Sequence, residues 1–491
     1  MKSLISRKDI EVPYPSEDDR RADDQRIKDS VGLEGLDIPL SLLRRIHNQL
    51  RLNKNDIVCF IGRNDKGYKI IDVNNEESYS FGLDLGTTNL VAVLYDNTAH
   101  ESVLEIKTEN PQITFGSDIL TRMHRAMGSG AEEVYRSIIE GINDLIKKAC
   151  NNAGVNKENV HAMAVAGNTA MSHFFLGLDI GTIPVAPFVP VIRKPGFFSA
   201  SELKIDVNPE ALVYVFPNAG SYVGGDIIAG IIASGMSESD ELSVLIDVGT
   251  NAEIVVGNRD WLLVGAGAAG PALEEGISMI GKRAGKGIIY DVEIKRGIID
   301  CRTFDNAQPQ GICGSGMVSL IYEMHRAGMI GDDGMLNPEQ EDVVTSNGYL
   351  EFALSCGSGD TLRIKQDEID NFLKSKAAMF TLLLVLLRSV GLQFSDIHKV
   401  YIAGALGNGI NVKKAAGIGM LPEWTQDTIV PTGNASLKGA RMLLADDSLP
   451  EKIDSITDKI TYKHMHDDPE FMREFMGAVF IPHTNPELLK V

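Results

Sequence analysis

Residues 81–96, FGLDLGTTNLVAVLYD, predict a strand, a tight polar turn and a second strand that returns beside the first. The first apolar run leads to a lone carboxylate, Asp84. The turn after it consists of four small or polar residues: Gly86, Thr87, Thr88 and Asn89. Such a turn can hold phosphate oxygens with its N–H groups and hydroxyls, and a nearby carboxylate can bind hydrated Mg²⁺. The stretch therefore indicates a magnesium–phosphate site.

The same pattern recurs in residues 244–256, VLIDVGTNAEIVV. An apolar strand again leads to a carboxylate, Asp247, and then to the turn residues Gly249, Thr250 and Asn251. The two aspartates are 163 residues apart, which is too long for a solenoid repeat and suits duplicated domains. An Asp-Gly-Thr cluster alone can also be an ordinary turn, but its recurrence favours two lobes with an interdomain nucleotide cleft.

Length and charge narrow the class of protein. The 491 residues exceed what one hydrophobic core usually serves, so at least two domains are expected. A net charge of −20 disfavours binding to nucleic acid or to an anionic membrane. The most apolar run, residues 377–387, is too short to span a bilayer, and no secretory signal is visible. We expect a cytoplasmic protein.

The five cysteines form no CxxC motif, so we expect reduced thiols and no intrinsic iron–sulfur cluster. Lys376 precedes the apolar run, and we expect its ammonium group to extend to solvent.

Composition divides the chain into four parts. Residues 1–35 are dense in charge and predict a flexible arm, and residues 36–78 predict a small α+β module. Alternating strands and helices after each phosphate hairpin predict two α/β lobes, at residues 79–235 and at residues 236–491 with a C-terminal tail.

One glycine-dense turn later in the chain is a candidate for contact with a nucleoside, because bare backbone allows close approach of a ring. It contains Gly404, Ala405, Leu406 and Gly407.

Four carboxylates are catalytic candidates: Asp84, Asp226, Asp247 and Glu253. Asp84 and Asp247 are expected to hold Mg²⁺ through water, and Asp226 or Glu253 to orient or deprotonate the attacking water. Two structural alternatives stay open. Asp226 can be a helix N-terminal carboxylate, and Glu253 can be a charge at a strand edge.

Taken together, five stretches resemble the signature segments of the actin, Hsp70 and sugar-kinase (ASKHA) ATPase superfamily. They are residues 84–89 (DLGTTN), 164–171 (AVAGNTAM), 247–253 (DVGTNAE), 401–409 (YIAGALGNG) and the segment near Gly433. The resemblance implies an α/β fold of two duplicated actin-like, ribonuclease H-like ATPase lobes that bind ATP and Mg²⁺, in addition to the small N-terminal module. It also assigns Gly433 and Asn434 to nucleotide binding.

A narrower resemblance is to the C-terminal domains of RACo-like reductive activators of corrinoid proteins. It is carried by residues 110–123 (NPQITFGSDILTRM), 246–256, 265–276 (GAGAAGPALEEG), 311–321 (GICGSGMVSLI), 374–379 (KSKAAM) and 401–409. The resemblance implies an ATP hydrolase that drives reductive activation of a corrinoid protein or a similar low-potential metalloenzyme.

Members of that family carry an iron–sulfur cluster in an additional domain. Because this chain has no cysteine motif at either end, we expect a separate low-potential iron–sulfur protein to supply electrons. An activator of a nickel-tetrapyrrole enzyme and a small-molecule kinase of the same fold are alternatives. An actin-like assembly protein is a third, and the oligomeric state, a homodimer included, stays open.

Overall fold

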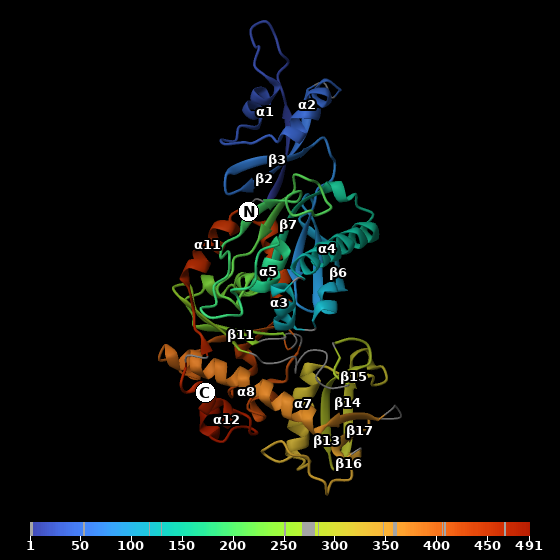
Figure 1. The fold of residues 1–491 in the computed structure, drawn as a ribbon, viewed down its shortest axis with the longest axis vertical. Coiled ribbons are helices and arrows are strands. Elements are labelled where there is room, and N and C mark those ends of the chain that lie inside the picture. The colour runs from blue at the N-terminus through green and yellow to red at the C-terminus, as the bar shows by residue number, and fades with distance from the viewer. Residues whose placement is uncertain are drawn as a thin grey trace. The chain divides into compact units, whose positions relative to one another are not determined.

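The computed structural model describes residues 3–52, 55–116, 118–128, 130–249, 252–267, 280–282, 284–346, 348–356, 361–404, 406, 409–465 and 468–491. The chain forms two compact units (Figure 1). The first consists of Met1–Ala233 and Ser436–Asp458, and the second of Ser234–Ala435 and Lys459–Val491. Each unit contains a six-stranded mixed sheet and is described by itself.

The sheet of the first unit has the strand order β6-β5-β4-β7-β9-β8. Its strands are β4 (Tyr79–Leu85), β5 (Asn89–Asp96), β6 (Glu101–Glu109), β7 (Val160–Gly167), β8 (Gly196–Ser199) and β9 (Leu212–Val215). β4, β5 and β6 form an antiparallel meander, and β7 and β9 continue the sheet parallel to β4. Helix α4 (Ala131–Ala153) buries its apolar stripe in the core of this sheet, as its helical spacing predicts.

The sheet of the second unit has the order β20-β19-β10-β11-β12-β21. Its strands are β10 (Ser243–Val248), β11 (Ala252–Gly257), β12 (Leu262–Gly267), β19 (Lys399–Gly404), β20 (Ile429–Gly433) and β21 (Ile460–Tyr462). β10, β11 and β12 are an antiparallel meander, and β19 and β20 add in parallel to β10.

The duplication predicted from the two phosphate hairpins is confirmed by strand order and by register. Asp84 pairs with Ala166 in the first sheet, and Asp247 pairs with Ala403 in the second. One position further along, Leu85 lies opposite Gly167 and Val248 lies opposite Gly404. In each sheet, an aspartate near the carboxyl end of one strand therefore lies beside a parallel strand that ends in a glycine.

The remaining described elements cover these sheets or form small sheets of their own. The helices are α3 (Ile119–Met127), α5 (Thr169–Leu176), α6 (Gly225–Ser234), α7 (Gly314–Arg326), α8 (Gln366–Ser389), α9 (Val412–Gly417), α10 (Ala435–Ala445), α11 (Leu449–Lys459) and α12 (Phe471–Ala478). The strands are β13 (Ile288–Lys295), β14 (Ile298–Thr303), β15 (Gly311–Ile312), β16 (Val343–Ser346), β17 (Tyr349–Leu354) and β18 (Leu362–Lys365). Among the helices described, none has the length and apolar character needed to cross a membrane.

The N-terminal residues differ from the flexible arm expected from their charge. β1 (Ile5–Glu11) pairs antiparallel with β2 (Asp56–Asn64), which also pairs with β3 (Gly67–Val73). Helices α1 (Asp23–Val31) and α2 (Leu40–Leu52) complete the module. The few apolar side chains among the charges are enough to bury a core: Ile10, Val12, Ile27 and Val31. The overall composition of this segment is dominated by charged residues, so it does not reveal that these few apolar side chains form a core.

Residues 436–458 belong to the first unit, whereas the sequence pattern predicts them in the lobe at 236–491. The reason lies in close backbone packing. A Cβ on Gly439 of α10 would lie 2.1 Å from the carbonyl oxygen of Ala229, and a Cβ on Gly82 would lie 3.3 Å from the backbone nitrogen of Arg441. The two glycines allow α10 to lie directly on the first unit's elements.

The expectation of reduced thiols is wrong for one pair. Cys301 on β14 and Cys356 after β17 form a disulfide, with their Cα atoms 5.7 Å apart. The other cysteines are free and buried, and burial raises the pKa of Cys59 to about 12 and that of Cys150 to about 11. A separation of 55 residues leaves no local sequence signal for the pair.

Candidate functional site

The first half of the candidate site surrounds the turn between β4 and β5. Asp84 lies near the end of β4 and is partly buried. Ser436, at the start of α10, donates a hydrogen bond from Oγ to Asp84 Oδ1 at 2.9 Å. The turn residues 86–88 are also partly buried. The turn's own close packing requires a glycine at position 86, because a Cβ there would lie 2.6 Å from the carbonyl oxygen of Asn89.

A second loop reaches the turn from the end of β7. Asn168 donates from Nδ2 to the hydroxyl of Thr87 at 3.0 Å. The same side chain caps α5 by accepting from the backbone N–H of Met171 at 3.0 Å. Gly224 packs against this loop so tightly that a Cβ would lie 2.4 Å from the Cα of Asn168. The loop is therefore held from both sides.

Asp226 lies in the first turn of α6, where its Oδ1 accepts from the backbone N–H of Ile227 at 2.8 Å. Burial, and secondarily the negative charge of Asp84, raises its pKa above the ordinary value. Two carboxylates that repel each other in a partly buried position are stabilised by a cation between them. Their hard oxygen atoms are the ligands that Mg²⁺ prefers, so these residues fit that ion. Within the described residues, no cluster of three or more His, Cys, Asp or Glu side chains could hold a metal ion.

The second half of the candidate site surrounds Asp247 at the end of β10. Asp247 lies opposite Glu253 in the β10–β11 register, and Glu253 is buried. Gly404 has φ +71°, a conformation that favours glycine. A Cβ at this position would lie 2.3 Å from the carbonyl oxygen of Val248 and 2.6 Å from Asp247 Oδ1. The glycine therefore leaves room for the carboxylate of Asp247.

The other residues predicted to contact a nucleoside are placed as follows. Gly433 ends β20 with φ +63°, and Asn434 beside it is exposed. Leu406 has its side chain in the hydrophobic core, which leaves only its backbone for a ligand. Gly249 is described and partly buried. Four predicted residues lie outside the described part of the chain: Thr250, Asn251, Ala405 and Gly407. Their assignment stays a prediction, as does the prediction that both half-sites hold one nucleotide.

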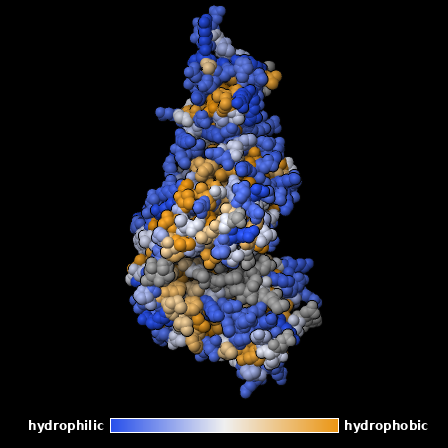
Figure 2. All heavy atoms as spheres, in the orientation of Figure 1, coloured by the Kyte–Doolittle hydropathy of each residue, from blue (hydrophilic) through white to orange (hydrophobic). Residues whose placement is uncertain are grey.

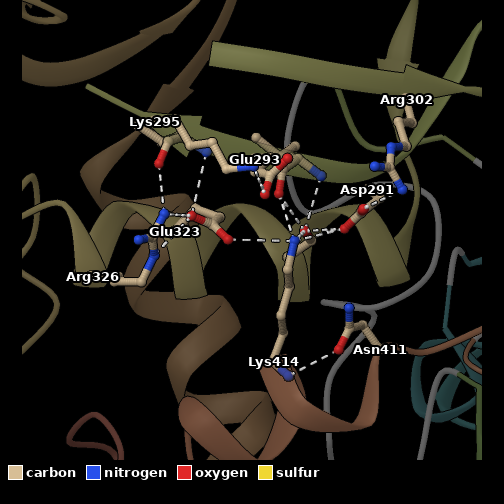
Figure 3. A network of polar contacts seen from close by, with 11 residues as sticks. Asp291, Glu293, Lys295, Arg302, Glu323, Arg326, Asn411 and Lys414 are labelled. Atoms are coloured by element: carbon tan, nitrogen blue, oxygen red, sulfur yellow. Dashed lines mark hydrogen bonds and ion pairs between the residues drawn. The ribbon is translucent and has the colours of Figure 1, made fainter. Parts of the chain in front are cut away.

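A buried cation, Lys414, joins α9 to its neighbours in the second unit (Figure 3). Lys414 on α9 donates from Nζ to Asp291 Oδ1 at 2.7 Å, to the carbonyl oxygen of Val292 at 2.6 Å and to Ser319 Oγ at 2.7 Å. Glu323 adds an ion pair at 3.5 Å. The hydrogen bond from Lys414, together with the other polar contacts of Asp291, holds the pKa of Asp291 below its ordinary value. The network therefore ties α9 to β13 and α7.

The sequence reasoning missed three residues that the structure brings to the first half-site, Asn110, Arg122 and Ser436, and it missed the buried Lys414 in the second unit. Asn110 and Arg122 lie within the stretch 110–123, which the family resemblance had marked without a role. No local pattern marks Lys414 or Ser436, because their partners are far away in the sequence.

Comparison with protein families matches the whole chain in three consecutive parts. Residues 241–491 match the C-terminal ASKHA domain of RACo, residues 79–239 the RACo middle region, and residues 1–79 the RACo linker region.

Two curated relatives and one solved structure cover most of the chain. The corrinoid activation enzyme RamQ of Eubacterium limosum is 30% identical over 438 residues, which are 86% of this chain and 72% of that protein. The [Co(II) methylated amine-specific corrinoid protein] reductase of Methanosarcina barkeri is 25% identical over 424 residues, 79% of this chain and 74% of that protein. The structure of a reductive activator for a corrinoid, iron–sulfur protein has a TM-score of 0.93 and 33% identity, and covers 99% of this chain and 80% of that one.

Proposed function

The chain belongs to the RACo family, and from that premise we propose that it is an ATP-dependent activator that drives reductive activation of a corrinoid protein. Both curated relatives and the matching structure are described as acting on corrinoid proteins, which supports this choice of partner. The structural observation that carries the ATPase part is the turn 86–88 with Asp84 beside it, in which Ser436 holds Asp84 and Asn168 holds Thr87. The two functional halves in this proposal are the two units, with residues 436–458 belonging to the first.

ATP and Mg²⁺ are the proposed cofactors. Asp84 is the Mg²⁺ ligand through water in the first half-site, and Asp247 is assigned the same role in the second. When bound, Mg²⁺ neutralises phosphate charge during phosphoryl transfer.

The protein groups have separate tasks in this proposal. Ser436 fixes the orientation of the Asp84 carboxylate, and Asn168 fixes the hydroxyl of Thr87. Asp226, in the first turn of α6 and close enough to Asp84 to feel its charge, is the preferred group to accept a proton from the attacking water. Glu253 is the second candidate for that role.

Reductive activation needs a shift in the partner's redox equilibrium. To move a two-state equilibrium from 1:99 to 99:1, an effector must bind the favoured state about 5.5 kcal/mol more tightly. For a one-electron couple, each tenfold shift corresponds to about 59 mV. We propose that ATP-dependent binding to the corrinoid protein supplies this preference, while electrons come from a separate low-potential donor.

The test combines calorimetry with spectroscopy of cobalt. The protein is titrated with MgATP, and then mixed with a purified Co(II) corrinoid protein and titanium(III) citrate as reductant. We expect heat of MgATP binding, ATP hydrolysis stimulated by the corrinoid protein, and conversion of the Co(II) absorbance to that of Co(I) only when MgATP is present.

Two results would contradict the proposal. A lack of MgATP binding would remove the ATPase part. MgATP binding with no effect on the cobalt absorbance would contradict the assignment of a corrinoid protein as partner. The same assay with a nickel-tetrapyrrole enzyme would then test that alternative. Transfer of phosphate to a small molecule would instead identify a kinase.

A further inference from the structure

Residues 110–122 hold the turn 86–88 from one side. Asn110 Nδ2 donates to the carbonyl oxygen of Gly86 at 2.8 Å, and the backbone N–H of Asn110 donates to that of Thr88 at 2.9 Å. Arg122 Nη1 donates to the carbonyl oxygen of Thr87 at 2.5 Å. All three carbonyl groups of the turn are therefore engaged by two residues of one segment.

The geometry of the peptide unit gives this clamp a consequence. In a trans peptide the C=O and the following N–H point in opposite directions. When the carbonyls of Gly86 and Thr87 face residues 110–122, the N–H groups of Thr87 and Thr88 face the other way. Neither N–H group donates a hydrogen bond to any residue in the described part of the chain. Two aligned, unused donors are what a phosphate oxygen requires.

Arg122 also brings a charge to this position. Its side chain is 0% exposed, and its Nε donates to the carbonyl oxygen of Gly116 at 2.7 Å. It forms no ion pair with any described residue, and its buried Nη2 has no hydrogen-bond partner among them. Burial lowers its pKa to about 10, so the group remains cationic at neutral pH. The carbonyl oxygens of Gly116 and Thr87 and the nearby charge of Asp118 balance this cation, which makes the contact to the turn a charge-assisted one.

We propose that Arg122 is a positioning residue for the phosphates of the nucleotide, acting together with Asn110 to aim the N–H groups of Thr87 and Thr88 at them. The proposal rests on the proposed ATP-binding function and adds to it the element that makes the turn selective for a phosphate chain. The alternative is that Arg122 only fastens the loop at Gly116 to the turn. The two differ in whether removal of Arg122 affects nucleotides with phosphates more than adenosine.

The experiment compares Arg122→Gln, Arg122→Lys and wild type in calorimetric titrations with MgATP and with adenosine. Arg125→Gln is the matched control, because Arg125 lies on the same helix and is exposed. We expect Arg122→Gln to bind MgATP roughly 10- to 100-fold more weakly, as loss of a charged hydrogen-bonding group predicts, and adenosine with unchanged affinity. Arg122→Lys keeps the charge without the planar fork, so it should recover part of the MgATP affinity. Hydrogen exchange of the peptide containing Thr87 and Thr88 should slow with MgATP in wild type and much less in Arg122→Gln.

Each outcome has one meaning. Wild type that binds no MgATP refutes the proposed function itself. Wild type that binds MgATP, with an Arg122→Gln variant that has the same ratio of MgATP to adenosine affinity, refutes the positioning role alone. If Arg122→Gln does not fold, Asn110→Ser removes the contact to Gly86 and is measured in the same way; an unchanged ratio there also refutes the proposal.

Discussion

Ser436 Oγ donates a hydrogen bond to Asp84 Oδ1 at 2.9 Å, although 352 residues separate the two. The contact joins the start of α10 to the end of β4, within the first unit. A carboxylate that is expected to bind hydrated Mg²⁺ has to present a fixed lone pair to the ion's water shell. Ser436 occupies one oxygen of Asp84 and so fixes which part of the carboxylate faces the turn.

Replacing Ser436 by alanine should weaken this orientation without removing the charge. We expect Ser436→Ala to lose roughly 1 kcal/mol of unfolding free energy, as loss of a hydrogen bond to a partly buried carboxylate predicts. The Mg²⁺ concentration needed for half-maximal ATP hydrolysis should rise several-fold. Ser455→Ala, at an exposed position of α11, is the control and should match wild type in both measurements. An unchanged Mg²⁺ dependence in Ser436→Ala would show that Asp84 needs no support from α10.

Asp226→Asn tests the assignment of the proton acceptor. The change keeps the size and the capping hydrogen bond with Ile227 but removes the base. We expect the hydrolysis rate at saturating MgATP to fall by roughly 10²- to 10⁴-fold, with MgATP affinity changed little. The measurements are single-turnover hydrolysis and calorimetry, with Asp144→Asn at an exposed position of α4 as the control. Retention of wild-type turnover in Asp226→Asn would move the role to Glu253.

Gly404→Ala should damage the second half-site for two reasons. The residue has φ +71°, and an added Cβ would lie 2.6 Å from Asp247 Oδ1. Gly391 provides a matched control, because it has φ +72° with no atom within 4 Å of a Cβ. We expect Gly391→Ala to lose about 1 kcal/mol of unfolding free energy from backbone strain alone, and Gly404→Ala to lose roughly 3 kcal/mol or more. Urea denaturation measures both, and equal losses would contradict the proposed clash at Asp247.

The sequence predicted the parts of the fold that repeat a local pattern. Both phosphate hairpins, their duplication and the glycine that follows each central parallel strand could be found because each depends on neighbouring residues. The charged N-terminal segment was assigned wrongly, since a few apolar positions such as Ile27 and Val31 decide its packing. The Cys301–Cys356 bond also had no local signal.

The sequence marked residues of the candidate site only where they lie in local motifs. Ser436 and Arg122 support those motifs through contacts with residues 352 and 35 positions away, and Lys414 holds α9 through a residue 123 positions away. Such contacts depend on how α10, α3 and α9 pack, and a single sequence carries no spacing rule for them. Residues that hold the site in place through such contacts could therefore be identified only from the structure.

Lys414→Met should destabilise the second unit. The ammonium group of Lys414 contacts Asp291 and Glu323, which would be left with less compensation of their charge. We expect a loss of roughly 3 kcal/mol in unfolding free energy, because one partner of a buried ionic network is removed. Lys413→Met, at the exposed neighbouring position, should change little. Adding Asp291→Asn to Lys414→Met should restore part of the loss, and full additivity of the two changes would contradict a direct coupling.

Lys376 makes the stability of the second unit depend on pH. We expected its ammonium group in solvent, but the side chain is fully buried and Nζ donates to the carbonyl oxygens of Phe480 at 2.6 Å and Pro482 at 2.8 Å. Burial lowers its pKa from 10.5 to about 7. As the pH rises above that value, the folded protein releases the proton while the unfolded chain still binds it, so the unfolding free energy increases.

The prediction compares wild type with Lys376→Met, which cannot titrate at this position. The difference in unfolding free energy, wild type minus variant, should increase by roughly 1–2 kcal/mol between about pH 7 and about pH 8.5. Urea denaturation at several pH values measures it, and Lys374→Met, at an exposed position of the same helix, should show no such increase. A difference that stays constant with pH would show that the two carbonyl groups keep Lys376 charged throughout this range, and that burial alone does not set its pKa.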